Sequence, residues 1–172
     1  MSFLGIPELQ AFLTRGGPVL LWIMFATFAM WALILEREMY FRFAHKAVAD
    51  EAIEEWRSRS DRKSLMAHWV RDKLVSEVRM KAEQNVTLTK ALVALAPLLG
   101  LLGTVTGMVT VFDVMAVTDG ADAKAMSEGV SQATIPTMAG MVASISGIIF
   151  TSSMDQRVKR AVQQVEDQME VS

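Results

Sequence analysis

Three long apolar runs alternate with charged segments along the chain. The runs cover residues 17–35, 91–117 and 129–153, and Asp113 is the only charged residue within them. A hydrocarbon core about 30 Å thick needs roughly 20 helical residues, so each run is long enough to cross a bilayer. The second and third runs exceed that length and are expected to tilt or project. The pattern predicts transmembrane helices at 18–35, 91–117 and 129–154.

Short segments flank these spans. Residues 1–17 carry a short apolar pattern with Pro7, which is typical of a helix on the outer membrane surface. Pro18 follows Gly16 and Gly17, which suits the first turn of a new helix. No basic cluster precedes the first run, so we expect that span to be retained rather than cleaved. Residues 118–128 are predicted to form a loop.

The charged segments 36–90 and 155–172 are predicted to be helical extensions of the spans. No Gly or Pro occurs between residues 19 and 96, so few breaks are expected. We predict a turn near 58–64, with Ser60 or Asp61 capping the helix that follows. Apolar residues recur at helical spacing in both segments and indicate packing faces rather than ligand sites. They are Leu65, Met66, Trp69, Val70, Leu74, Val78 and Ala82, and in the tail Val158, Val162, Val165 and Met169.

The distribution of Lys and Arg predicts the orientation in the membrane. Of the 17 basic residues, 15 lie in 36–90 and in the tail, whereas Arg15 and Lys124 are the only others. Basic residues near span ends stay on the cytoplasmic side. We therefore expect a periplasmic N-terminus, a periplasmic loop at 118–128 and cytoplasmic segments at 36–90 and 155–172.

Composition excludes several classes of function. The chain has no cysteine, so disulfides and thiolate metal sites are excluded. His45 and His68 lie in the charged segment, where we expect them to be solvated, and no spacing makes them a metal pair. Phosphate loops, nucleophile elbows and HExxH motifs are missing from the sequence. We expect neither an enzyme nor a cofactor, a metal or a nucleic-acid partner.

The third run places small and polar residues along one helix face. At about 100° per residue, this face spans an arc of about 140°. It contains Gly129, Gln132, Ala133, Pro136, Thr137, Gly140, Ala143, Ser144, Gly147 and Thr151. Ile135, Met138, Met141, Val142, Ile145 and Ile149 occupy the opposite side. The second run has a similar face, made of Ala96, Gly100, Gly103, Thr104, Gly107 and Thr110.

Two interpretations of these faces remain open. Small residues let membrane helices approach closely, and Ser or Thr hydroxyls can bond to their own helix. A partly hydrated pathway is the other interpretation, because the amide of Gln132 is harder to satisfy locally and Pro136 frees carbonyls in the preceding turn. Asp113 is the only ionisable residue in the spans. If protons cross here, another chain must contribute the titrating group.

Two stretches resemble a known family. "APLLGLLGTVTGMVTVF" (96–112) and "GVSQATIPTMAGMVASISG" (129–147) are similar to the second- and third-span signatures of the ExbB/TolQ/MotA proton-channel family. The three spans, the long first charged segment and the helical tail match as well. The small size and the outer N-terminal helix favour the ExbB branch over TolQ. MotA-type members have four spans and longer chains.

The resemblance implies an all-α membrane subunit that assembles as a homo-oligomeric ring, a pentamer, in the bacterial inner membrane. Its second and third spans would surround helices of an ExbD-like single-span partner that bears a membrane aspartate. The complex would use proton motive force to drive a TonB-like protein for nutrient import at the outer membrane. A TolQ-like role in envelope integrity and a non-conducting membrane scaffold are the alternatives.

The resemblance also suggests which residues form the proton pathway. Thr104 and Thr137 match the family's polar threonines, and Gln132 stands where many members have glutamate. Pro136 and Ser146 replace commoner residues. The predicted pore lining is Thr104, Gln132, Thr137, Ser144, Gly140, Gly103, Gly107 and Thr151, with Pro136 and Pro97 shaping the helices.

Overall fold

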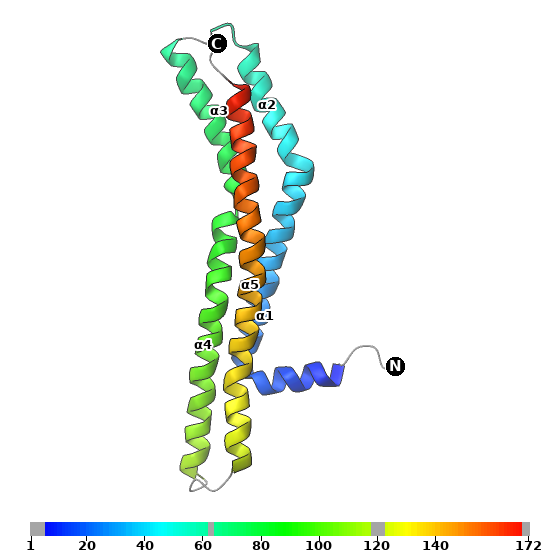
Figure 1. Ribbon diagram of the computed structural model, residues 1–172, viewed down its shortest axis with the longest axis vertical. Coiled ribbons are helices and arrows are strands. Elements are labelled where there is room, and N and C mark those ends of the chain that lie inside the picture. Colours follow the sequence, from blue (N-terminus) through cyan, green and yellow to red (C-terminus); the bar gives the residue numbers. More distant parts are fainter. Residues whose placement is uncertain (1–5, 62–63, 118–122, 170–172) are drawn as a thin grey trace. The chain divides into compact units, whose positions relative to one another are not determined.

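The computed structural model describes residues 6–61, 64–117 and 123–169, and every regular element among them is helical. In chain order these are α1 (Ile6–Met39), a π-helical turn η1 (Tyr40–Ala44), α2 (His45–Ser58), α3 (Leu65–Glu83), α4 (Val86–Val117) and α5 (Ala123–Gln168) (Figure 1). The all-α prediction is confirmed for this part of the chain. Residues 118–122 of the predicted loop lie outside it, and the loop's remainder is helical from Ala123 onward.

Three helical stretches are long and apolar enough to cross a membrane. Each stretch contains a window of 18 residues that is apolar enough for a membrane span. The mean hydropathy of this window is 2.2 in Phe12–Ser58, 2.0 in Leu65–Val117 and 1.6 in Ala123–Gln168. At most 33% of any window is buried within the chain. Lipid tails are about as apolar as leucine, so a bilayer accommodates the remaining apolar surface. Length and composition therefore support the three predicted spans.

The described residues fall into two compact units. We call residues 6–31 and 91–148 the apolar unit, and residues 32–90 and 149–169 the charged unit. The helices α1, α4 and α5 each contribute residues to both units.

In the apolar unit, α1 bends sharply at Gly17. This residue has φ 67° and ψ −175°, a conformation that only glycine adopts without strain. Pro18 follows directly, and the helix continues from there in a different direction (Figure 1). This bend coincides with the predicted boundary between residues 17 and 18. Of the predicted 1–17 segment, residues 1–5 lie outside the described part, and its place on the membrane surface stays a prediction.

In the charged unit, the predicted packing faces are confirmed only in part. Leu74, Val78 and Ala82 of α3 are buried, as are all four apolar residues of the tail, Val158, Val162, Val165 and Met169. Leu65, Met66 and Trp69, at the start of α3, are instead largely exposed. The predicted apolar face of α3 is thus covered within the chain from Leu74 onward, although the neighbouring Ala67 is buried as well.

The cap of α3 differs from the prediction. The helix begins at Leu65, and Ser64 is its N-cap, with Oγ accepting a hydrogen bond from the backbone N–H of Ala67 at 3.2 Å. The predicted caps, Ser60 and Asp61, lie too far before this start. Asp61 instead accepts a hydrogen bond from the backbone N–H of Ser64 at 3.1 Å. The prediction placed the turn correctly and its capping residue wrongly.

A helix break between α3 and α4 was not expected from the sequence. Asn85 has φ 61°, a left-handed conformation that asparagine tolerates better than most residues. Its Nδ2 donates to Glu36 at 3.0 Å, and Arg37, which is only 1% exposed, donates to the carbonyl of Lys81 at 2.9 Å. The end of α1 therefore holds the joint between α3 and α4 through two hydrogen bonds.

The two histidines differ in exposure. His68 is exposed, as predicted. His45 is half-buried, and its Nδ1 is a buried atom without a hydrogen-bond partner among the described residues. The prediction that both are solvated is wrong for His45, because this residue begins α2 directly after the π-helical turn and lies beside the rings of Tyr40 and Phe41.

Candidate functional site

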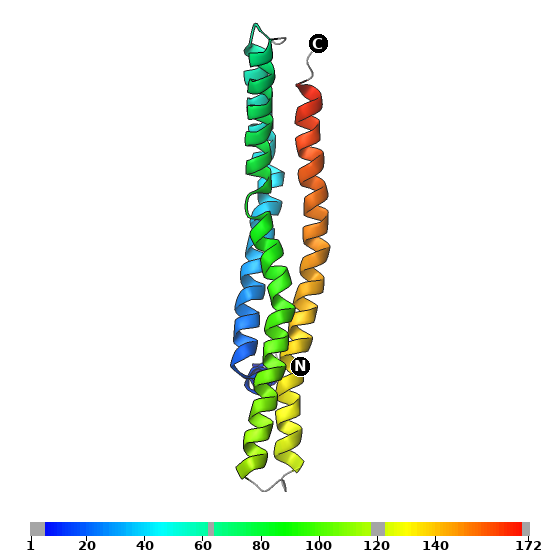
Figure 2. The same cartoon turned by 90° about the vertical axis from the view of Figure 1, so that its left-hand side faces the viewer.

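Within the apolar unit, α4 and α5 lie side by side (Figure 2). Glycines bring their backbones together. A Cβ atom on Gly100 would lie 2.9 Å from the Cα of Thr137, and one on Gly107 would lie 2.6 Å from the Cα of Ala133. A Cβ on Gly140 would lie 2.5 Å from the carbonyl oxygen of Ala96. No side chain fits at these positions, so the helix pair depends on glycine there.

Thr137 joins the two helices by a hydrogen bond. Its Oγ1 donates to the carbonyl oxygen of Gly100 at 2.9 Å. That carbonyl is reachable because Gly100 has no side chain and the backbones are close. Pro136, the next residue along α5, is fully buried beside Gly103. This part of α5 is therefore fixed against α4 by both packing and a polar contact.

Thr104 is placed differently from Thr137. It is half-buried, and its Oγ1 donates to the carbonyl of Leu101 in its own helix at 2.7 Å. Its hydroxyl oxygen can still accept a hydrogen bond from a group outside the chain. The two threonines therefore have separate roles within one chain: Thr137 holds α4 against α5, whereas Thr104 keeps accepting capacity at the surface of the pair.

The other predicted pathway residues are divided among three settings. Gly103, Gly107 and Gly140 are buried in the contact between α4 and α5. Ser144 and Thr151 are also buried, although Thr151 belongs to the charged unit. Gln132 and Pro97 are half-buried. The structure thus brings most of these residues together along one helix pair, and their exposure to a pore stays a prediction.

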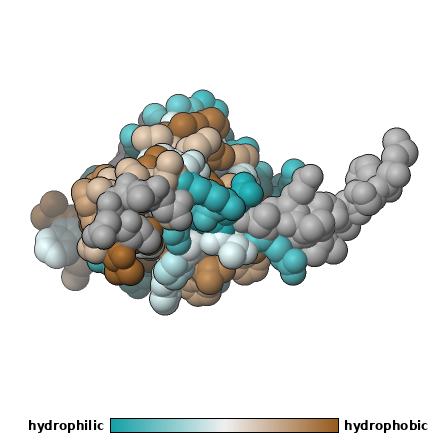
Figure 3. All heavy atoms as spheres, turned by 90° about the horizontal axis from the view of Figure 1, so that it is seen from below, coloured by the Kyte–Doolittle hydropathy of each residue, from teal (hydrophilic) through white to brown (hydrophobic). Residues whose placement is uncertain are grey.

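The opposite faces of the helices carry large apolar residues. On α5, Met138, Met141, Val142 and Ile145 are exposed, as the helix pattern predicted. On α4, Leu98, Leu101 and Val105 are exposed as well. The helix pair is two-sided, with small residues inside and large apolar residues outside. Figure 3 shows the molecule from below, where hydrophobic and hydrophilic residues adjoin each other.

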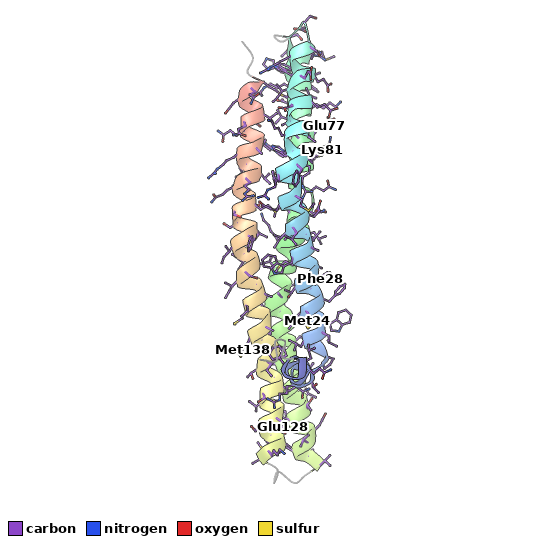
Figure 4. All side chains as sticks on the ribbon, turned by 90° about the vertical axis from the view of Figure 1, so that its right-hand side faces the viewer. Met24, Phe28, Glu77, Lys81, Glu128 and Met138 are labelled. Atoms are coloured by element: carbon purple, nitrogen blue, oxygen red, sulfur yellow. The ribbon has the colours of Figure 1, made fainter. Side chains whose placement is uncertain are left out.

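A polar cavity lies at the end of the helix pair where α5 begins. It has a volume of about 610 Å³. Its lining carries four hydroxyls, a carboxylate, a guanidinium and an amide, from Thr14, Thr110, Ser127, Ser131, Glu128, Arg15 and Gln132. Figure 4 shows Glu128 near this end of α5. One liquid water occupies about 30 Å³, so the cavity has room for several.

Among the α5 residues that line this cavity, Gln132 lies furthest along the helix. A Cβ on Gly17 would lie 3.0 Å from Nε2 of Gln132, so the bend of α1 comes directly against this amide. Gly17 is required for its positive φ, whereas the flexible end of the Gln132 side chain can move aside for a Cβ at this position. The sequence had indicated Gln132 and Thr110, but it had not indicated Arg15, Thr14 or Glu128. The only signal for these three residues in the sequence was that each carries a charge or a hydroxyl and lies just outside an apolar run.

Within the described part of the chain, no group of three His, Cys, Asp or Glu side chains could hold a metal ion. The cavity offers hydroxyl and amide groups, together with the carboxylate of Glu128 and the guanidinium of Arg15. Hydroxyl and amide groups can hydrate a charge or pass a proton between donors and acceptors. The hydroxyl and amide groups of the α4 and α5 spans do not themselves titrate near neutral pH.

Comparison with known proteins identifies the family. Over 65 residues, the chain is 42% identical to a Synechocystis protein provisionally named biopolymer transport protein ExbB-like 1. Over 68 residues, it is 35% identical to ExbB-like 3 of the same organism, named in the same way. These matches cover 36% and 38% of this chain, and only 26% and 32% of the relatives. Residues 38–167, well over half of the chain, match a family profile, and the chain belongs to the MotA/TolQ/ExbB proton channel family.

Proposed function

We propose that this chain is an ExbB-like proton-channel subunit of the bacterial inner membrane. With an ExbD-like single-span partner, it converts proton motive force into mechanical work on a TonB-like protein for nutrient import. Family membership, the names of two relatives and three membrane-crossing helices support this function. The bias of Lys and Arg supports a periplasmic N-terminus and a cytoplasmic C-terminus.

The polar cavity that ends at Gln132 is the observation that carries the proposal. Hydroxyl, amide and charged groups gather there, at one end of two otherwise apolar helices. Glycine contacts of α4 and α5 extend up to this cavity, where Gly129 packs against Val111, but close packing does not require the charged and hydroxyl groups that surround the space. A hydrated mouth that leads to Gln132 gives protons a place to enter on the outer side.

The chain does not supply the titrating group of the pathway. Asp113 is the only ionisable residue in 91–117 and 129–153, and it is exposed and does not line the cavity. Intramembrane carboxylates are the usual proton carriers. An aspartate in the single membrane helix of a partner therefore completes the pathway, and the uncharged groups of this chain solvate that carboxyl in both protonation states.

The energies involved are compatible with a proton pathway that is lined by uncharged polar groups. One proton crossing 100 mV releases about 2.3 kcal/mol. Exchanging one or two hydrogen bonds involves about 1 kcal/mol each. Hydroxyl and amide groups such as those of Thr104 and Gln132 therefore bind the partner's aspartate with only small differences in energy. A partner helix can move past them. A fixed positive charge facing the aspartate would bind it too strongly.

A ring of several copies, a pentamer by family resemblance, surrounds the partner helices in this proposal. The exposed apolar faces of α4 and α5 support it, because they offer surface for a second copy as well as for lipid. Neighbouring genes distinguish the TonB branch from the TolQ branch. A TonB-like gene beside that of this chain supports the former, and Tol genes support the latter.

A non-conducting scaffold is a second candidate function, and one observation favours it. The hydroxyl of Thr137 and the glycines of the predicted pathway are engaged in the contact between α4 and α5. A protein whose polar face serves only to join its helices needs no proton path. The two candidates differ in one measurable property, which is proton flux.

Proton flux into liposomes separates these candidates. The chain alone is expected to conduct few protons, and flux is expected to appear when the ExbD-like partner is incorporated with it. Replacing the partner's membrane aspartate by asparagine is expected to abolish that flux while the complex stays assembled. Absence of flux in the intact complex would favour the scaffold, and strong flux from the chain alone would contradict the need for a partner's carboxyl group.

A further inference from the structure

A second polar groove lies in the charged unit, between the end of α1 with its π-helical turn and the part of α5 that follows the apolar run. Its volume is about 450 Å³. Arg42 lines it from one side, and Arg157 and Arg160 line it from the other, together with Glu38 and Phe41. Three arginines against one glutamate leave a formal charge of +2. The groove is thus suited to an anion.

Only one of the three arginines makes an ion pair or a hydrogen bond with another residue in the described part of the chain. Arg157 donates from Nη1 to Oε2 of Glu38 at 2.6 Å, which fixes its position. The side chains of Arg42 and Arg160 make no ion pair or hydrogen bond with another residue in the described part of the chain, and both are exposed. The hydrogen bond from Arg157, and more weakly the charge of Arg42, lowers the pKa of Glu38. The hydrogen-bond donors of Arg42 and Arg160 remain available for a ligand next to Arg157, which is already oriented. Guanidinium groups match phosphate oxygens in geometry and can bind them with two parallel hydrogen bonds.

The groove lies at the depth of lipid headgroups. Arg157 follows the end of the third apolar run, residue 153, by four residues, or about 6 Å of helix. Arg42 and Arg160 lie seven residues beyond the ends of their runs, or about 10 Å. The headgroup layer extends roughly 5 to 8 Å beyond the hydrocarbon core. Arginine side chains can reach back over such distances, so all three can meet the layer of lipid phosphates.

Apolar side chains continue from this groove toward the spans. Leu35 precedes Arg42 by seven residues and is 58% exposed, and Phe150 precedes Arg157 by seven residues and is 44% exposed. Residues seven apart lie close to the same face of an α-helix, as Phe150 and Arg157 do on α5. The π-helical turn η1 offsets Arg42 from Leu35 around the helix axis. Each side of the groove therefore combines a cationic head with an apolar residue two turns closer to the membrane. An amphiphile fits this arrangement better than a free anion.

We propose that this groove binds the phosphodiester headgroup of an anionic phospholipid in the adjoining leaflet. Arg42 and Arg160 bind the phosphate oxygens, Arg157 and Glu38 form the wall beside them, and the acyl chains run past Leu35 and Phe150. This site is independent of the proton pathway, since it uses none of the residues of the α4 and α5 contact.

Binding of phosphatidylglycerol to the purified full-length protein in a nonionic detergent tests the proposal. Native mass spectrometry is expected to show phosphatidylglycerol retained and phosphatidylcholine displaced. In the double variant Arg42→Gln/Arg160→Gln, affinity for phosphatidylglycerol is expected to fall roughly 30-fold, because each arginine near a membrane surface contributes about 1 kcal/mol. The matched control Lys46→Gln/Lys159→Gln removes the same charge nearby and is expected to change affinity less than twofold.

Three outcomes would overturn the proposal. The first is an equal loss of affinity in both double variants, which would mean that net charge alone attracts the lipid. The second is binding of inorganic phosphate as tight as that of phosphatidylglycerol, which would assign the groove to a free anion. The third is a change of oligomer mass in Arg42→Gln/Arg160→Gln without loss of lipid, which would assign the groove to acidic groups of a second copy.

Discussion

In the apolar unit, α4 and α5 meet through glycines and one interhelical hydrogen bond, whereas in the charged unit arginines link the helices. Arg71 of α3 donates from Nε to the carbonyl of Met169 at 2.8 Å and from Nη2 to the carbonyl of Glu166 at 3.0 Å. Lys90 and Asp155 form an ion pair at 2.6 Å. Neither kind of contact would serve in the other unit.

The solvent explains this difference. In lipid, apolar side chains gain little by leaving their surroundings, so helices associate by close packing and by hydrogen bonds of the kind that Thr137 makes. In water, burial of residues such as Val78 and Val165 supplies the main driving force, and arginines complete the last turns of helices. The apolar unit should therefore be sensitive to added volume, and the charged unit to lost donors.

Added volume in the apolar unit is expected to have the largest effect. Gly100→Leu places a side chain against the backbone of Thr137, and overpacking of this kind destabilises by about 3 kcal/mol or more. Thermal unfolding in detergent measures the loss. Ala94→Leu, an added side chain at an exposed position of the same helix, is the control and should change stability little. Equal effects of the two variants would mean that α4 and α5 are not closely packed.

A lost donor in the charged unit is expected to have an intermediate effect. Arg71→Gln removes two hydrogen bonds to the final carbonyls of α5 and should destabilise by about 1 to 2 kcal/mol, less than a buried charged bond because Arg71 is partly exposed. Faster hydrogen exchange at the end of α5 would reveal it. Lys73→Gln loses only an exposed pair with Glu77 and serves as control. If exchange at this end is as slow in Arg71→Gln as in Lys73→Gln, Arg71 does not cap α5.

The two threonines provide the finest comparison, because both carry a hydroxyl on the same helix pair. Thr137→Val removes the bond to Gly100 and should destabilise the pair by about 1 kcal/mol, whereas Thr104→Val removes only a bond within its own helix and should have a smaller effect. Thr137→Ser keeps the donor and should restore most of the loss. Unfolding midpoints that coincide for both Val variants would contradict the distinction.

The sequence predicted the spans, a new helix beginning at Pro18 and the two-sided character of α4 and α5, because hydropathy, helical periodicity and the preference of Pro for a first turn depend on the local sequence alone. It did not predict the break at Asn85, since asparagine lacks the strong signal of Gly or Pro and its left-handed φ is held by Glu36 of another helix. It indicated that Thr137 lies on a polar face. It did not show whether the Thr137 hydroxyl faces a pore or donates to a carbonyl of the neighbouring helix. That distinction depends on which face of α4 meets α5, and a single helix pattern does not contain it.

The cavity beside Gln132 likewise combines residues of three helices. Arg15 and Thr14 come from the segment before the bend of α1, Thr110 from α4, and Glu128 from α5. Each lies at the margin of an apolar run, where a polar residue is ordinary. Only the fold shows that they surround one space.

Proton flux through the Gln132→Leu variant tests most directly whether this cavity admits protons. The variant is incorporated into liposomes with its partner, beside the wild type and Gln163→Leu, which makes the same change at an exposed position of the charged unit. Leucine keeps the volume but removes the amide, so flux should fall roughly tenfold, as the loss of one hydrogen bond of about 1.4 kcal/mol at the entrance would produce. Gln163→Leu should conduct like the wild type. Flux at the wild-type rate through an assembled Gln132→Leu complex would contradict the account.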